Sequence, residues 1–242
     1  MSAHSAHSTG QRAPGAFEQY RTLLAKDLRR EFRTREMLVS MGVYALLVIV
    51  VFGVALGFAR PADAFLQISG GLLWSLIAFT SLLGLNRSFA AEQDNGCIEG
   101  LLLAPLDRGV VFLAKASSNL LFLLLVEAIA VPLFWVFFAS YATPAASAPL
   151  MVLPLLLGSV GIAGIGTLLS TITACTRGKD VMLALLFVPV VFPLLYACVS
   201  ATAGCIAGGE LLEGLARSLA LAGGYDVIML ALSWVLYDFV IS

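Results

Sequence analysis

The sequence predicts an all-α polytopic membrane protein with six transmembrane helices. Of its 242 residues, 60% are hydrophobic and only 12% are charged, with a mean hydropathy of +0.97. Soluble globular chains carry about 25% charged residues. In addition, charge-poor windows of about 20 residues, long enough to cross a bilayer, recur along the chain. A water-soluble core could not bury this much apolar surface.

The expected spans follow one another with short connections. The uncharged stretch 128–176 is too long for one span, and the run Tyr-Ala-Thr-Pro-Ala-Ala-Ser-Ala-Pro at 141–149 divides it into two. The last window carries Asp226 and Asp238 near its two ends, where we expect water to solvate them. The six windows are 37–59, 64–86, the two parts of 128–176, 181–203 and 221–241.

A surface helix is expected before the first span, over residues 16–37. Its apolar residues recur three and four positions apart, with basic residues between them, which is typical of a helix lying in the membrane interface. A simple basic anchor and a coupling role both fit this helix. Residues 1–15, rich in Ser, Ala and Gly, are expected to form a disordered cytoplasmic tail. The apolar stripe is Phe17, Tyr20, Leu24, Leu28 and Phe32.

The basic residues predict the orientation, because Lys and Arg in short loops stay on the cytoplasmic side. Half of the 14 Lys and Arg residues lie within the first 35 positions. Five more basic residues are expected on the same side, in the connections after expected helices two and four: Arg87, Arg108, Lys115, Arg177 and Lys179. Only Arg60 and Arg217 fall on the other side. Six spans then place both termini in the cytoplasm, with residues 38–242 forming the transmembrane domain.

Few polar residues lie within the spans. Glu127 is the charged residue well inside the third, about 18 Å beyond Lys115 by helical rise. An ionisable group at this depth is a functional candidate, and a structural contact between helices fits it as well. Four glycines in the fourth span predict close helix packing, with a substrate path as the alternative: Gly158, Gly161, Gly164 and Gly166.

Cysteine and histidine usage gives no sign of a metal or redox centre. There is no Cys-x-x-Cys pattern, and both histidines lie in the N-terminal tail. We interpret Cys175 and Cys198 as small apolar membrane residues, and expect Cys205 in an outer loop. We predict no catalytic residue and no metal site.

The connection between the second and third spans, about 87–112, is the most informative polar segment. Gly96 is well placed to end a helix, and apolar residues such as Ile98 and Leu101 lie beside Glu92 and Glu99. A short apolar helix exposed to the cytoplasm suits a partner surface. A helix folded back onto the bilayer is the alternative.

Residues 92–115, with the core Asn-Gly-Cys-Ile-Glu-Gly-Leu-Leu-Leu-Ala-Pro-Leu-Asp-Arg, closely resemble the CcmB family, the membrane subunit of the ABC-type haem exporter of cytochrome c maturation. Further similarity covers 71–74, 82–89, 166–170 and 180–193. The resemblance implies an ABC-2-like permease in the bacterial inner membrane, with an N-terminal elbow helix and six spans. Its implied partners are a CcmA ATPase subunit, CcmC, CcmD and the haem chaperone CcmE.

The family's loop looks like the coupling helix on which the ATPase pushes. The resemblance assigns this role to Glu92, Asp94, Gly96, Ile98, Glu99, Gly100, Leu101, Pro105, Asp107 and Arg108. The chain has no GxxxxGK[ST] motif, so we expect ATP to be hydrolysed by the partner subunit and this chain not to be an enzyme.

The resemblance names haem as the candidate substrate. A second copy of the chain is the natural partner by symmetry, membrane lipids surround it, and no nucleic-acid partner is expected. Two alternatives stay open: an ABC-2 exporter of another amphipathic substrate, and a non-transporting scaffold of a maturation complex.

Overall fold

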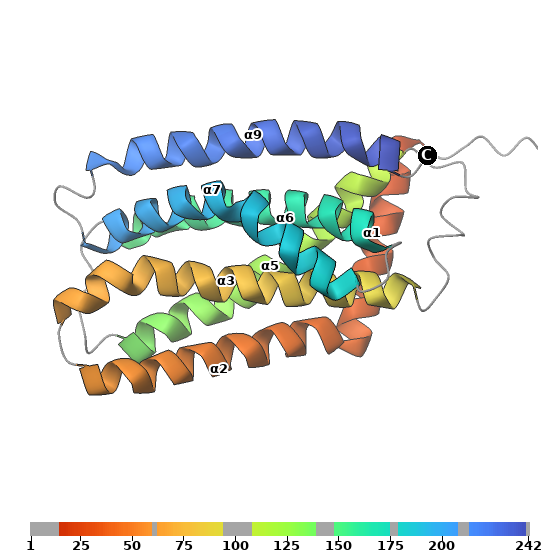
Figure 1. Ribbon diagram of the computed structural model, residues 1–242. Helices are drawn as coiled ribbons and strands as arrows, with labels where there is room; N and C mark the ends of the chain where they lie inside the picture. Colours follow the sequence, from red (N-terminus) through yellow and green to blue (C-terminus); the bar gives the residue numbers. More distant parts are fainter. Residues whose placement is uncertain are drawn as a thin grey trace, which may run out of the picture.

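The computed structural model describes residues 15–59, 62–93, 108–138, 148–174, 179–207 and 213–240. Within these ranges the chain is helical, and six helices are long and apolar enough to cross a membrane. They run side by side in one bundle (Figure 1). The six are α2 (Glu36–Ala59), α3 (Ala62–Gln93), α5 (Arg108–Phe138), α6 (Val152–Ala174), α7 (Lys179–Ala207) and α9 (Leu215–Val240), with a 3-10 turn, η1 (Ala148–Met151), before α6. The prediction of an all-α, six-span membrane protein is confirmed.

Helix α1 (Ala16–Thr34) lies across one end of the bundle, which we call the α1 end (Figure 1). The sharp corner between α1 and α2 is made at Arg35, whose φ of 56° is left-handed. Glu31 holds this corner: its carbonyl oxygen accepts from the Arg35 amide at 2.6 Å, and its Oε1 accepts from the Leu38 amide at 2.8 Å. The Glu31 side chain thus accepts a hydrogen bond from the Leu38 amide, one of the amides in the first turn of α2 that have no intrahelical partner.

The face that α1 turns to the bundle combines Leu23 and Leu28, which pack on the core, with polar residues that are buried more deeply. Its buried residues are Gln19, Asp27 and Glu31. By contrast, Phe17 and Phe32 of the expected apolar stripe are 72% and 55% exposed. This arrangement suits a helix whose apolar residues meet lipid. The position of α1 in the membrane interface stays a prediction.

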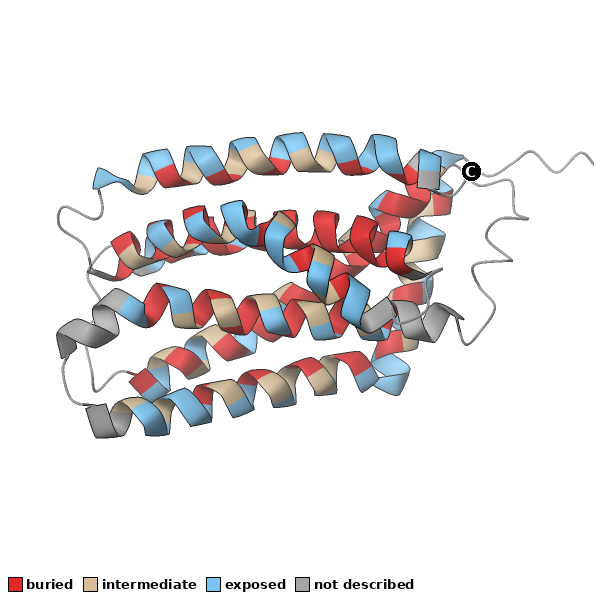
Figure 2. Cartoon of the chain, viewed as in Figure 1, coloured by how far each residue is buried: buried red, intermediate tan, exposed pale blue. Residues whose placement is uncertain are grey.

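Helix α6 forms the centre of the bundle. It packs against α3, α5, α7 and α9, and 72% of its spanning window is buried, compared with 22% for α2 and 17% for α9. The outer helices α2 and α9 carry exposed residues along most of their length (Figure 2). Because lipid covers these outer surfaces in a membrane, their exposed Leu, Val and Phe side chains are expected there.

The glycines of α6 create the space for its neighbours. A β-carbon added at any of the four would meet the side chain of an adjacent helix, so the packing interpretation of these glycines is confirmed. The four pairs are Gly158 with Trp74, Gly161 with Asp226, Gly164 with Leu230 and Gly166 with Leu85. Trp74 is fixed further because its Nε1 donates to Thr202 Oγ1 at 2.9 Å.

The expectation of Cys205 in an outer loop is wrong. Helix α7 continues to Ala207, beyond the predicted end at residue 203, and Cys205 is fully buried within it. Cys198 is also buried, as expected for a small apolar residue. The extra turn forms because Cys205 and Ile206 still pack on the core of the bundle.

We expect Gly158→Ala to destabilise the bundle, because its methyl group would meet the Trp74 ring and lie 3.1 Å from Cys198 Sγ. Overpacking of this kind costs about 1–3 kcal/mol. Thermal unfolding of the detergent-purified protein measures the effect. Gly71→Ala is the matched control, since nothing lies within 4 Å of its added β-carbon. Equal melting temperatures for the two variants would contradict the packing role.

Candidate functional site

A row of polar side chains runs through the apolar bundle along one face of α5. The buried polar residues of α5 are Lys115, Ser118, Asn119 and Glu127, and their spacing of three, four and eight residues keeps them on neighbouring parts of that face. Together with Asp27 of α1 and Ser159 and Thr167 of α6, they form what we call the polar seam. The seam joins three helices that are distant in sequence.

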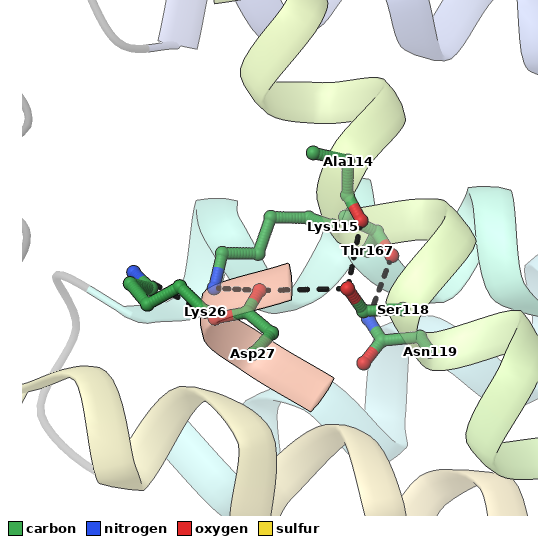
Figure 3. Close-up of polar contacts among 7 residues, drawn as sticks. All are labelled: Lys26, Asp27, Ala114, Lys115, Ser118, Asn119 and Thr167. Atoms are coloured by element: carbon green, nitrogen blue, oxygen red, sulfur yellow. Dashed lines mark hydrogen bonds and ion pairs between the residues drawn. The ribbon is translucent and has the colours of Figure 1, made fainter. Parts of the chain in front are cut away.

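An ion pair forms the α1 end of the seam (Figure 3). Lys115 Nζ lies 3.0 Å from Asp27 Oδ2, and the two side chains are only 6% and 5% exposed. Ser118 Oγ lies 3.5 Å from the same Asp27 oxygen and 2.9 Å from the Ala114 carbonyl oxygen. Each charge compensates the other in a place with little water, so loss of one partner leaves an uncompensated buried charge, at a cost of about 3–5 kcal/mol.

Lys115 was expected in a cytoplasmic connection, and this expectation is wrong. Helix α5 begins at Arg108, so Lys115 lies two turns inside it and is buried. Sequence reasoning also missed Asp27, its partner. The signal that could have found Asp27 is its position in a series of polar residues four or eight apart, Gln19, Asp27 and Glu31, which marks a polar edge beside the apolar stripe.

Two hydrogen bonds continue the seam between α5 and α6. Asn119 Nδ2 donates to Thr167 Oγ1 at 2.9 Å, and Ser159 Oγ donates to Glu127 Oε1 at 2.7 Å. Asn119 and Glu127 are about 12 Å apart along α5. Their partners Thr167 and Ser159 are the same distance apart along α6, in the opposite order because α6 runs antiparallel to α5. These two hydrogen bonds, which we call the rungs of the seam, fix the register of α5 relative to α6.

Glu127 therefore has a partner on α6 and lies deep within the bundle. Its residue is 5% exposed. Ser159 is about 15 Å from the first residue of the α6 spanning window, which extends over Pro149–Thr173. The hydrogen bond favours the interpretation of Glu127 as a helix contact, since polar side chains join helices in lipid. A role for Glu127 in transport stays a prediction.

The expectation that water solvates Asp226 is wrong. The residue is 4% exposed and packs against Gly161 of α6, near Cys198 of α7. Helix α9 begins at Leu215, earlier than the predicted residue 221, so Asp226 lies about 16 Å along it rather than near its end. Neither carboxyl oxygen has a hydrogen-bond partner among the described residues. The side chain of Asp238 lies outside them.

An apolar groove of about 390 Å³ lies between α2 and α5, which also pack on each other. Phe32 of α1 lines it at the α1 end, Gly42 and Ala45 on α2, and Ile129 and Leu133 on α5. With only apolar side chains among its lining residues, the groove fits an apolar body such as an acyl chain. No three His, Cys, Asp or Glu side chains in the described ranges come together as a metal site.

Most of the predicted coupling loop lies outside the described residues, namely Asp94, Gly96, Ile98, Glu99, Gly100, Leu101, Pro105 and Asp107. Glu92 is in the last turn of α3, and its side chain is not described; Arg108 is the first residue of α5 and is partly buried. The helices before and after the loop both reach the α1 end of the bundle (Figure 1). The loop assignment stays a prediction.

The family model described as CcmB protein matches residues 18–236. The chain belongs to the CcmB family. Its matched region runs from α1 nearly to the end of α9 and therefore includes the whole polar seam.

Curated relatives are similar over most of their length. The heme exporter protein B of Pseudomonas aeruginosa is 31% identical over 174 residues, 72% of this chain and 75% of the relative. The protein of the same name from Rhodobacter capsulatus is 30% identical over 206 residues, 84% and 88% of the two chains. That of Paracoccus denitrificans is 28% identical over 196 residues, 81% and 87% of the two chains.

We expect Glu127→Gln to leave the stability of this CcmB-family protein within about 1 kcal/mol, because the amide oxygen can still accept from Ser159. Glu127→Leu should be less stable, since it leaves the Ser159 hydroxyl without this partner. Thermal unfolding in detergent compares the two variants with the parent. A large loss of stability in Glu127→Gln would show that the charge itself is required.

Proposed function

We propose that this protein is the transmembrane subunit of an ABC-type haem exporter that serves the biogenesis of c-type cytochromes. The observation that carries the proposal is the CcmB match over residues 18–236, together with relatives named heme exporter protein B that cover most of both chains. Six helices suited to crossing a membrane fit a permease subunit. An exporter of another amphipathic substrate and a scaffold receive no support from these relatives.

The proposed location is the bacterial inner membrane, with both termini in the cytoplasm. The α1 end gathers the basic residues of α1, and the helix ends that carry Arg87, Arg108 and Lys179 meet there (Figure 1). Arg217 is at the opposite end, in the first turn of α9. This asymmetry supports a cytoplasmic α1 end, because basic residues are retained inside.

ATP hydrolysis is assigned to a separate CcmA-like subunit that docks at the α1 end. The support is that α3 ends and α5 begins at the α1 end, where the basic residues gather. The remaining proposed partners are CcmC-, CcmD- and CcmE-like proteins, which handle haem, and a second copy of this chain. The substrate is haem, and the ATP is bound by the partner.

Movement of the loop would enter the bundle through α5. Arg108 begins that helix, and the hydrogen bonds from Asn119 to Thr167 and from Ser159 to Glu127 tie it to the central helix α6. Because α6 also packs on α3, α7 and α9, a tilt of α5 would change the packing of most of the bundle. The chain's own residues thus convert a push at one end into helix movement.

Co-purification tests this function first. The tagged protein is isolated from its native membrane in mild detergent, its partners are identified by mass spectrometry, and an absorption spectrum is recorded for haem. An ATPase together with a haem-handling protein is the expected result. An ATPase with unrelated partners would contradict the assignment of haem as the substrate. The absence of an ATPase would favour a non-transporting scaffold.

We expect Glu99→Arg and Gly96→Pro to abolish most cytochrome c maturation while membrane insertion stays normal, because both change the surface on which the ATPase is proposed to push. Haem staining of cytochromes in a complemented deletion strain measures maturation. Glu213→Arg is the matched control, an exposed charge reversal at the opposite end of the bundle. Full maturation with Glu99→Arg would show that the loop assignment is wrong.

A further inference from the structure

Helix α1 packs mainly against α5, although α2 follows it directly in the chain. Its contacts with α2 are few. The corner at Arg35 turns α1 away from α2, and the buried residues of α1 then meet α5. Helix α1 is therefore attached chiefly to α5, the helix that follows the predicted coupling loop.

This attachment depends on a buried ion pair, not on apolar packing alone. Asp27 and Lys115 are within 3.0 Å and almost fully buried, with Ser118 beside them (Figure 3). Two apolar side chains could fill such a site, and they often do so at no loss of stability. Unlike apolar surfaces, however, a paired charge has one favourable partner position. The pair thus fixes where along α5 the crossing helix sits.

A neighbouring residue shows how local this constraint is. Lys26 Nζ lies 3.6 Å from Asp27 Oδ1, but its side chain is 44% exposed. Exposed ion pairs of this kind contribute little because water and salt screen them. The same carboxylate therefore has one exposed and one buried lysine partner, and only Lys115 belongs to α5.

We infer that Asp27 and Lys115 are positioning residues that make α1 and α5 move as one body. The inference rests on the proposed function where it concerns transport: a displacement that the ATPase delivers at Arg108 reaches α1, two turns of α5 beyond. Since Phe17 and Phe32 of α1 face outward, the elbow helix would then shift within the membrane interface together with α5. The pair would transmit movement as well as hold the helix.

The rigidity of this link can be measured without transport. Spin labels are placed at Arg29 of α1 and Leu113 of α5, both exposed, and the full chain is reconstituted in nanodiscs for distance measurement by pulsed electron paramagnetic resonance. A narrow distance distribution is expected for the parent and for the charge swap Asp27→Lys with Lys115→Asp. The apolar pair Asp27→Leu with Lys115→Met should broaden it. A broad distribution in the parent would overturn the inference, whatever the substrate proves to be.

The transport consequence is tested in the purified complex with its ATPase. We expect the apolar pair to fold and to hydrolyse ATP, but to mature about fivefold less cytochrome c for each ATP, within the range of ordinary coupling between sites. The charge swap should restore most of this ratio. Lys26→Ala is the control and should match the parent.

Full coupling in the apolar pair would show that the ion pair is only an anchor. If the apolar pair does not fold, the charge swap is the test. A charge-swap variant that folds but matures less cytochrome c for each ATP than the parent also contradicts the inference. A parent complex that matures no cytochrome c would instead refute the proposed function, while the distance measurement would still judge the link between α1 and α5.

Discussion

Close approach to α6 is the constraint on which the rest of the bundle depends. In lipid the hydrophobic effect does not drive helices together, so association relies on van der Waals packing and a few polar contacts. The four glycines of α6 remove side chains where Trp74, Leu85, Asp226 and Leu230 enter. Because these residues belong to α3 and α9, a single small-residue helix organises both sides of the bundle. Gly158 and Gly161 each face two helices, so substituting either one would disturb α7 together with α3 or α9.

The polar seam adds register to this packing. Glycine contacts bring helices close but tolerate sliding, whereas a hydrogen bond is lost when its partners move by a few ångströms. The rungs at Asn119 and Glu127 fix α5 along α6, and Asp27 with Lys115 fixes α1 along α5. The seam thus links α1 to the central helix α6 through α5. The proposed coupling depends on this continuity, because a push transmitted by loosely packed helices would dissipate.

The sequence was sufficient for the six spans because each depends on local composition. The helix ends were harder to predict. Helices α7 and α9 extend beyond their charge-poor windows since tertiary contacts stabilise the extra turns, and this moved Cys205 and Asp226 from expected loop or interface positions into the bundle. The ion pair was also missed, because its partners, Asp27 of α1 and Lys115 of α5, are far apart in the sequence. Loop roles such as that of Glu99 rest on family resemblance, and no contact in the described residues tests them.

Helix α1 shows why a periodic apolar stripe has a different meaning beside a membrane. In a soluble protein such a stripe marks the face that packs on the core, but here Phe17 and Phe32 face outward while Asp27 and Glu31 are buried. We propose that lipid covers Phe17 and Phe32, while the contact of α1 with the protein combines Leu23 and Leu28 with the buried polar residues. Polar contacts are directional. A helix attached through them can slide with its partner through lipid without losing apolar burial, which is the property that an elbow moving together with α5 requires.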